Sequence, residues 1–235
     1  MISSLWTAAS GMAAQRLNID VIANNLANVN TSGFKKSRAD FEDLLYQNLR
    51  SPGANTAAGT EIPTGIQIGM GTKPVSVQKV FTQGDYVETK NELDLAIEGM
   101  GFFKVLSNGE EVYVRSGAFK VDSEGYLTTS NGERLQPEFS VPDGTVHFTV
   151  DSGGNMVCQG ADGAELASVQ LTLHSFKNPS GLLSIGGNKF RQTASSGDPV
   201  EGNPGIDGMG TVAQGYLEMS NVDVVEEMVQ MIAAQ

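Results

Sequence analysis

Cysteine and histidine are scarce in this sequence of 235 residues, which has one cysteine, Cys158, and two histidines, His147 and His174. A single cysteine excludes a disulfide within the chain, and a lone cysteine is more often a small buried side chain than a reactive thiol. No Cys/His spacing matches a zinc site. A pairing of either histidine with Cys158 or with a serine in the folded chain stays open. The sequence otherwise predicts no catalytic residue, no metal and no cofactor.

Clustered basic charge is also missing. The net charge is −12, and the longest basic run is Lys35-Lys36-Ser37-Arg38. A nucleic-acid-binding surface needs clustered Lys and Arg to displace counterions from phosphates, so we exclude nucleic acid as a partner. The glycine pairs within residues 69–71 and 99–101 are too short for a dinucleotide-binding motif, and we expect no small-molecule substrate.

Long apolar runs are absent as well. No segment approaches the roughly 18 consecutive apolar residues of a membrane-spanning helix. Residues 1–14 lack a basic n-region, and their apolar side chains are spaced rather than continuous. We therefore expect no cleaved secretory signal peptide, so a chain that leaves the cytoplasm must use another export route.

Heptad spacing marks both ends of the chain. Near the N-terminus it places apolar residues at Leu5, Met12, Ile19 and Leu26, with a second stripe at Ala8, Ile22 and Val29. This pattern predicts a helix that stops at Thr31-Ser32-Gly33. Near the C-terminus the same spacing runs through Val222, Val225, Val229 and Ile232, with Ser220 or Asn221 as the N-cap. Both stripes are narrow, so we predict that residues 1–33 and 218–235 form a coiled-coil domain that buries its remaining apolar surface against other copies.

A period of two replaces the heptads between these ends. Leu93, Leu95 and Ile97 alternate with polar or small residues, and Ser107-Asn108-Gly109 is a strong hairpin turn. We expect further strands at residues 118–121, 126–129, 146–150, 156–159 and 169–173. The fold class is therefore α+β, with an inserted all-β domain at residues 92–196 and helices at both ends.

An irregular connecting region is expected at residues 34–91 and 197–217. Within it Phe41, Leu44, Leu45 and Leu49 suggest a short helix, while Val75, Val77 and Val80 alternate as in a strand. Residues 46–65 are rich in Gly, Ala, Thr and Pro toward their end and are predicted to lack regular structure.

Residues 22–35 read Ile-Ala-Asn-Asn-Leu-Ala-Asn-Val-Asn-Thr-Ser-Gly-Phe-Lys. This segment resembles the signature of the flagellar rod, hook and hook-associated axial proteins. Asn is a poor interior helix former, so Asn24 and Asn25 need an explanation beyond a fraying helix end. Amide contacts between neighbouring copies explain them, together with Asn28 and Asn30. Residues 1–6, 41–47, 99–103 and 214–222 also resemble the distal-rod members of this family, and residues 46–65 are similar to an insertion that distinguishes them from the hook.

The resemblance implies a structural subunit of the distal rod and not an enzyme. Many copies would form a helical tubular drive shaft that carries torque from motor to hook, with the terminal helices innermost around a central channel. The implied partners are other copies of the chain, proximal rod proteins, the hook protein, the surrounding ring bushing proteins and the type III export apparatus. The implied location is the flagellar basal body from the periplasm to the outer membrane. The resemblance also implies a C-terminal helix that continues beyond Gln235.

Runner-up interpretations are a proximal rod or hook subunit and, more distantly, a cell-wall hydrolase or an adhesin-like binding module. For the rod subunit we expect contacts between copies to come from the helical stripes, the asparagines and the stretch 46–65. These predicted interface residues are Leu5, Met12, Ile19, Ile22, Asn24, Asn25, Leu26, Asn28, Val29, Tyr46, Leu49, Pro52, Ile62, Pro63, Val222, Val225, Val229 and Ile232.

Overall fold

A computed structural model describes residues 2–51, 64–206 and 208–235. The chain divides into two compact units, which we call the helical unit (residues 1–26, 37–78 and 225–235) and the β unit (residues 27–36 and 79–224). The expected α+β class is confirmed. The connecting region is shared, because residues 37–78 belong to the helical unit and the rest to the β unit. Among the described residues, no helix has the length and apolar content needed to cross a membrane.

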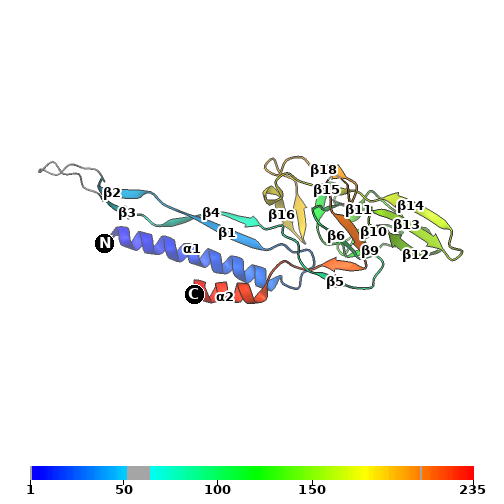
Figure 1. Ribbon diagram of the computed structural model, residues 1–235, viewed down its shortest axis with the longest axis horizontal. Coiled ribbons are helices and arrows are strands. Elements are labelled where there is room, and N and C mark those ends of the chain that lie inside the picture. The colour runs from blue at the N-terminus through cyan, green and yellow to red at the C-terminus, as the bar shows by residue number, and fades with distance from the viewer. Residues whose placement is uncertain (1, 52–63, 207) are drawn as a thin grey trace, which may run out of the picture. The chain divides into compact units, whose positions relative to one another are not determined.

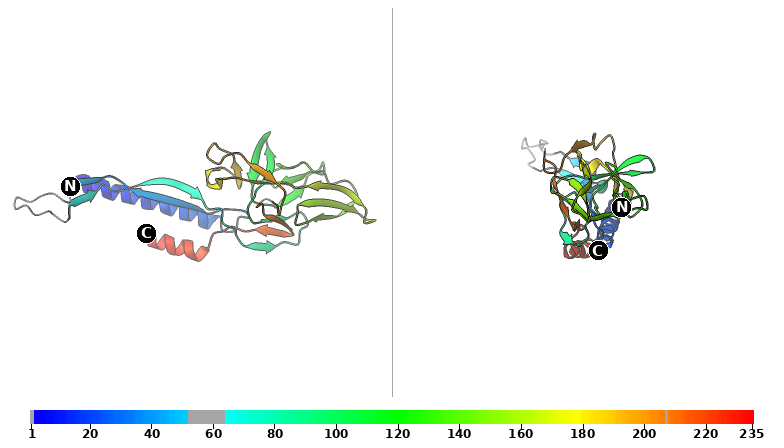
Figure 2. Two further views of the ribbon diagram at one scale, coloured as in Figure 1. Left: turned by 45° about the horizontal axis from the view of Figure 1, so that its top comes forward. Right: turned by 90° about the vertical axis from the view of Figure 1, so that its right-hand side faces the viewer.

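The helical unit contains the two terminal helices and a long two-part hairpin. Its helices are α1 (Ile2–Ala27) and α2, which begins at Val224 and ends at Ala234. Strand β1 (Ser37–Asp43) pairs with β4 (Thr72–Lys79), and β2 (Tyr46–Arg50) pairs with β3 (Ile66–Gly69). Figure 1 and Figure 2 show this hairpin running along α1, and the Thr72 amide donates a hydrogen bond to Ser10 Oγ at 3.4 Å. A side chain at Gly71 would collide with Ser10, so glycine permits this close approach.

Two local predictions for the helical unit are wrong. Residues 41–49 form parts of β1 and β2 instead of a short helix. Pairing with β4 and β3 gives the backbone N–H and C=O groups of both strands hydrogen-bond partners, and this tertiary pairing overrides the local helix propensity. Residues 46–50 are likewise a strand and not irregular. The remainder of the predicted irregular stretch, residues 52–63, lies outside the described residues. The predicted strand around Val75 and Val77 is confirmed as β4.

Both helices are shorter than the heptads suggested. α1 ends at Ala27, and the chain then turns through residues 28–33. Gly33 has the expected left-handed conformation, with φ of 69°, but it closes this turn instead of capping the helix directly. A side chain at Gly33 would also meet the Ser116 backbone. Val222 lies before α2 and is buried, so it is not a seam position of that helix.

The β unit is built from antiparallel sheets. The largest is a seven-stranded sheet in the order β16 (Leu183–Gly186), β17 (Lys189–Arg191), β8 (Glu110–Val114), β7 (Phe103–Ser107), β11 (Arg134–Gln136), β10 (Leu127–Thr129) and β9 (Phe119–Val121). A three-stranded sheet follows, with β12 (Thr145–Val150), β13 (Asn155–Gly160) and β14 (Glu165–Gln170). The pairs are β6 (Leu95–Glu98) with β19 (Thr211–Gln214), β5 (Tyr86–Glu88) with β20 (Tyr216–Glu218), and β15 (Leu173–Ser175) with β18 (Val200–Gly202). A short 3-10 helix spans Pro179–Gly181.

Most predicted strands of the β unit are present. The turn between β7 and β8 lies at Asn108 and Gly109, whose φ values of 52° and 84° are those of the tight hairpin that the sequence predicted. The predicted strand at residues 169–173 is wrong as a single element, because β14 ends at Gln170 and β15 begins at Leu173. Leu171 lies between them, buried, and its amide donates to Gly154 O at 2.8 Å.

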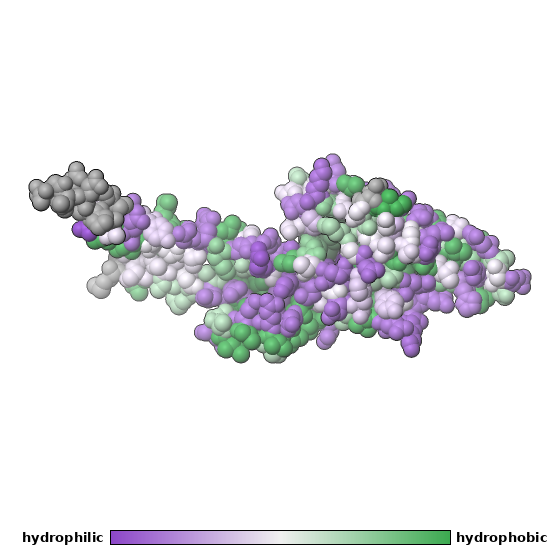
Figure 3. Space-filling view, viewed as in Figure 1, coloured by the Kyte–Doolittle hydropathy of each residue, from purple (hydrophilic) through white to green (hydrophobic). Residues whose placement is uncertain are grey.

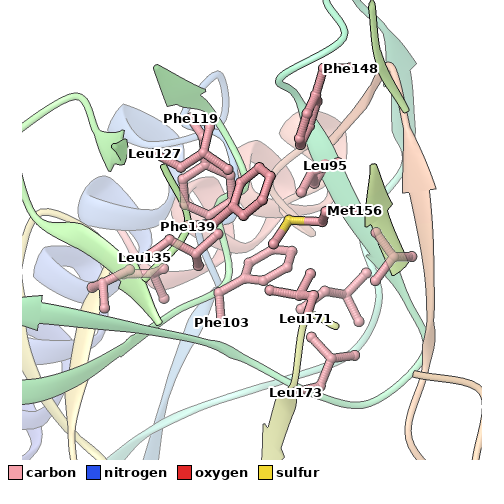
Figure 4. Packing of buried hydrophobic residues seen from close by; sticks show 14 of the residues in the cluster. Leu95, Phe103, Phe119, Leu127, Leu135, Phe139, Phe148, Met156, Leu171 and Leu173 are labelled. Carbon is pink, nitrogen blue, oxygen red and sulfur yellow. The ribbon is translucent and has the colours of Figure 1, made fainter. Parts of the chain in front are cut away.

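The hydrophobic core lies in the β unit. Figure 4 shows side chains from several strands converging on one another, among them Phe103 and Phe119, whose rings meet edge to face at 5.3 Å between centroids. A second cluster contains Phe102, Tyr113, Phe176, Leu182 and Phe190. By contrast, the buried apolar side chains among the described residues of the helical unit are Ala14 and Ile22.

Candidate assembly surfaces

The apolar stripe of α1 is exposed at one end and covered at the other. Leu5 is 70% exposed and Met12 is exposed to a similar degree, whereas Ile19 and Leu26 are half-buried and Ile22 is buried. Val29 follows the end of the helix and is half-buried. The solvent exposure of the predicted seam therefore falls along α1. Its N-terminal part is an apolar surface in contact with solvent, and its C-terminal part is mostly covered within the chain.

Exposed apolar side chains also cover one side of α2. Val229 and Ile232 are 60% and 72% exposed, and Val225 and Met228 are exposed beside them. Figure 3 shows this surface as a hydrophobic patch over α2. A coiled coil between the two terminal helices is not confirmed, because these seam side chains face solvent. Met228 was missed in the sequence, although its spacing of three from Val225 and four from Ile232 is a helical signal.

Asn25 has partners inside its own chain. Its side-chain nitrogen donates to Ser37 O at 2.9 Å and to Glu227 Oε2 at 3.2 Å, and its Oδ1 accepts from the Ser37 amide at 2.8 Å. Asn25 and Glu227 are both buried, so this amide joins α1, the start of β1 and α2. We therefore correct the intersubunit explanation of Asn25 to an intrachain one. Asn24 is exposed and Asn28 is half-buried.

The β2–β3 hairpin also carries exposed apolar side chains. Tyr46 and Leu49 on β2 are exposed, as are Ile66 and Ile68 on β3. The Tyr46 phenol donates a hydrogen bond to the neighbouring Asp43 carboxylate, and this bond raises the pKa of Tyr46. The other predicted residues of this stretch, Pro52, Ile62 and Pro63, lie outside the described residues.

Side chains that could hold a metal ion do not converge in the described part of the chain. No group of three or more His, Cys, Asp or Glu side chains there is placed to hold a metal. His147 is exposed with Nδ1 3.5 Å from Glu92, while His174 and Cys158 are buried. Burial raises the pKa of the Cys158 thiol, which disfavours the reactive thiolate.

Three sequence families match segments of the chain. They are the flagella basal body rod protein family at residues 5–35, the flagellar hook protein FlgE/F/G D1 domain at residues 96–158, and the flagellar basal body rod FlgEFG protein C-terminal family at residues 213–235. The first and third cover most of α1 and all of α2, and the second covers much of the β unit.

Full-length similarity to individual proteins decides the family. The chain is 46% identical to the flagellar basal-body rod protein FlgG of Borreliella burgdorferi and 44% identical to that of Buchnera aphidicola from Schizaphis graminum. These alignments cover 100% of this chain and 90% and 91% of the relatives. The chain belongs to the FlgG family of flagellar basal-body rod proteins. Identity to a FlgF protein of Caulobacter vibrioides is lower, at 33%. The chain is therefore a structural subunit of the flagellar distal rod and not an enzyme.

Proposed function

We propose that copies of this chain assemble through the exposed stripes of α1 and α2 into a helical tube that transmits torque from the motor to the hook. The exposure of apolar side chains on both terminal helices is the observation that carries this proposal. Burying a Val, Leu or Ile side chain contributes about 1.5–3 kcal/mol, so leaving several of them in water has a cost that assembly removes.

The exposed side chains of α2 support the same conclusion. Within the chain α2 is tied through Glu227, while Val229 and Ile232 remain exposed. Contacts with neighbouring copies would supply the missing burial and place both helices in the innermost layer of the tube, around its central channel.

The remaining features of the proposal follow from the family. Partners are adjoining proximal rod proteins, the hook protein and the ring bushing proteins around the rod. The location is the basal body between the periplasm and the outer membrane. The chain reaches it through the flagellar type III export apparatus.

Residues 46–65 are proposed to contact a neighbouring copy and to stiffen the rod. The exposed Tyr46, Leu49, Ile66 and Ile68 support this role, because they offer apolar anchors on both strands of the β2–β3 hairpin. Deleting residues 51–65 should leave folding and export intact but yield curved or bendable rods, as measured by electron microscopy of the assembled structures. Rods that remain as straight as the parent would remove this stretch from the proposal.

A seam variant tests the assembly itself. Negative-stain microscopy of the concentrated wild-type protein should show straight rods, and Val229→Asp should abolish them because a carboxylate on the seam would be desolvated. The matched control is Gln230→Asp, one position away on the same helix. Loss of rods in both variants would show that any added charge on α2 blocks assembly. Retention of rods in both would show that the apolar stripe of α2 is not an assembly contact.

A further inference from the structure

A buried group of three charges lies within the β unit, and sequence reasoning did not predict it. The Glu218 side chain is 1% exposed and lies between two cations. Its Oε1 accepts from Lys35 Nζ at 2.5 Å, and its Oε2 accepts from Arg115 Nε at 2.5 Å. Lys35 is as buried as Glu218, and Arg115 is 5% exposed. One carboxylate is therefore the shared counter-ion of two buried cations.

Most of the remaining donors of the two cations go to backbone carbonyls, and Arg115 also donates to Gln83 Oε1 at 3.3 Å. Arg115 donates to Ile97 O at 2.9 Å, to Gly99 O at 2.6 Å and to Gly101 O at 2.5 Å. Lys35 donates to Thr82 O at 2.7 Å. The charges thus hold five stretches of chain together: the segment after α1, the segment after β8 that carries Arg115, the strand β20 before α2, β6 with the loop that follows it, and the segment before β5.

The two segments that lead toward the terminal helices are also joined directly beside this group. The Gly33 amide donates to Glu218 O at 2.8 Å, and the Lys36 amide donates to Asn221 Oδ1 at 2.7 Å. The Met219 amide donates to Asp85 O at 2.8 Å. We call residues 33–36 the N-terminal connector and residues 218–221 the C-terminal connector.

Charge balance makes Glu218 the central member of the group. Burial lowers the pKa of Lys35, and the Glu218 carboxylate opposes this effect, so the buried ammonium depends on that carboxylate. Removing one partner of a buried ion pair leaves an uncompensated charge, which is far more costly than never burying the pair. Without Glu218, both Lys35 and Arg115 would lose their counter-ion. The least costly way to hydrate these two charges is to open the connectors to water.

We propose that Glu218 is a shared counter-ion that makes the two connectors open and close as one cooperative unit, separately from the hydrophobic core of the β unit. The core side chains of Figure 4 come from other segments, so they can stay packed when the connectors open. Both ends of the chain would then be released or retained together. In a rod, on the function proposed above, a load that reaches one connector would be shared by the other.

Amide hydrogen exchange of the full chain tests this cooperativity. In the wild type the amides of Gly33, Lys36 and Met219 should exchange with one common opening equilibrium. In Glu218→Gln all three should exchange faster by on the order of 100-fold, in line with a broken buried ion pair. The amides of β7 and β8 should keep their wild-type protection. Uniform acceleration of core and connectors, or acceleration of one connector alone, would overturn the proposal.

Two further variants keep the result decisive. Glu133→Gln breaks another ion pair of the β unit, in which Lys189 Nζ lies 2.6 Å from Oε1 of the buried Glu133, and should leave the connectors unchanged. Lys35→Met removes one cation while Arg115 and Glu218 stay paired, so it can be measured even where Glu218→Gln does not fold. It should uncouple the segments, with Gly33 and Lys36 exchanging faster than Met219. Unchanged exchange at all three amides in Lys35→Met would contradict the cooperative role. These measurements need no rod, so their outcome is independent of assembly.

Discussion

The helical unit and the β unit bury apolar surface in opposite ways. The β unit encloses two aromatic-rich clusters, whereas the helical unit buries Ala14 and Ile22 among its described residues and holds its elements together through the amide of Asn25. Several of its larger apolar side chains, such as Leu5 and Ile232, face solvent. We infer that the β unit is complete within one copy and that the helical unit is completed by other copies, so substitutions in the two units should act on different measurements.

Phe103→Ala should have the largest effect on folding. Phe103 is fully buried in the core of the β unit, and truncating such a Phe costs about 3–5 kcal/mol through lost burial and a residual cavity. Urea denaturation should show this loss. The control is Val121→Ala, since Val121 is exposed and should change stability by less than about 0.5 kcal/mol. Equal effects of the two variants would mean that the β unit is not organised around this core.

Asn25→Ala should have an intermediate effect, confined to the helical unit. Its loss leaves the buried Glu227 carboxylate and the Ser37 backbone without their amide partner, which costs about 1–3 kcal/mol before the small gain in helix propensity. Limited proteolysis should cleave α2 sooner, while urea unfolding of the β unit stays unchanged. Gln15→Ala, at an exposed position of the same helix, carries the propensity gain alone and should resist proteolysis like the wild type.

Acidification should loosen the β unit through His174. Burial and the nearby Lys104 lower the pKa of this imidazole below 6.5, while Glu201 and Glu111 oppose the shift, and Nδ1 has no partner among the described residues. The unfolded chain therefore binds a proton at His174 more readily than the folded chain does. The neutral His174 contributes stability that is present above pH 6.5 and is lost as the pH falls through the lowered pKa.

Thermal unfolding at a series of pH values checks this direction. The wild type should lose stability on acidification more steeply than His174→Phe, which keeps a ring beside Tyr113 but cannot be protonated. His147→Gln, at the exposed histidine, should retain the wild-type slope. Identical slopes in wild type and His174→Phe would assign the acid sensitivity to carboxylates instead.

Local patterns predicted the parts of this structure that depend on local physics. The heptads located α1, period-two alternation located β6, and Asn108-Gly109 located the β7–β8 turn. The strands β1 and β2 were mistaken for a helix, because the spacing of Phe41, Leu44 and Leu45 fits a helical face and the pairing partner lies beyond residue 64.

Long-range polar contacts could not be predicted in the same way. Lys35 and Glu218 are separated by 183 positions, and nothing in the residues next to either one indicates a buried charge. Asn25 illustrates the same limit, since its unusual position in a helix was noticed but its partner Glu227 lies 202 positions away. Residue chemistry indicated that the asparagine needed a partner, and only the fold could show that the partner belongs to the same chain.

Leu5→Asp should have the smallest effect on folding and a decisive one on assembly. Leu5 is 70% exposed, so a charge there should change the stability of dilute protein by less than about 0.5 kcal/mol. In a rod the same side chain would be buried in the seam, where desolvating a carboxylate costs several kcal/mol. Circular dichroism of the dilute protein should therefore match the wild type, while negative-stain images show no rods.

Leu26→Asp, at a half-buried position of the same stripe, should lose assembly with unchanged thermal unfolding of the β unit, but it should also loosen the helical unit. Rods formed by Leu5→Asp would mean that the solvent-facing end of α1 is not part of the seam, and the contrast between the two units would then rest on α2 alone.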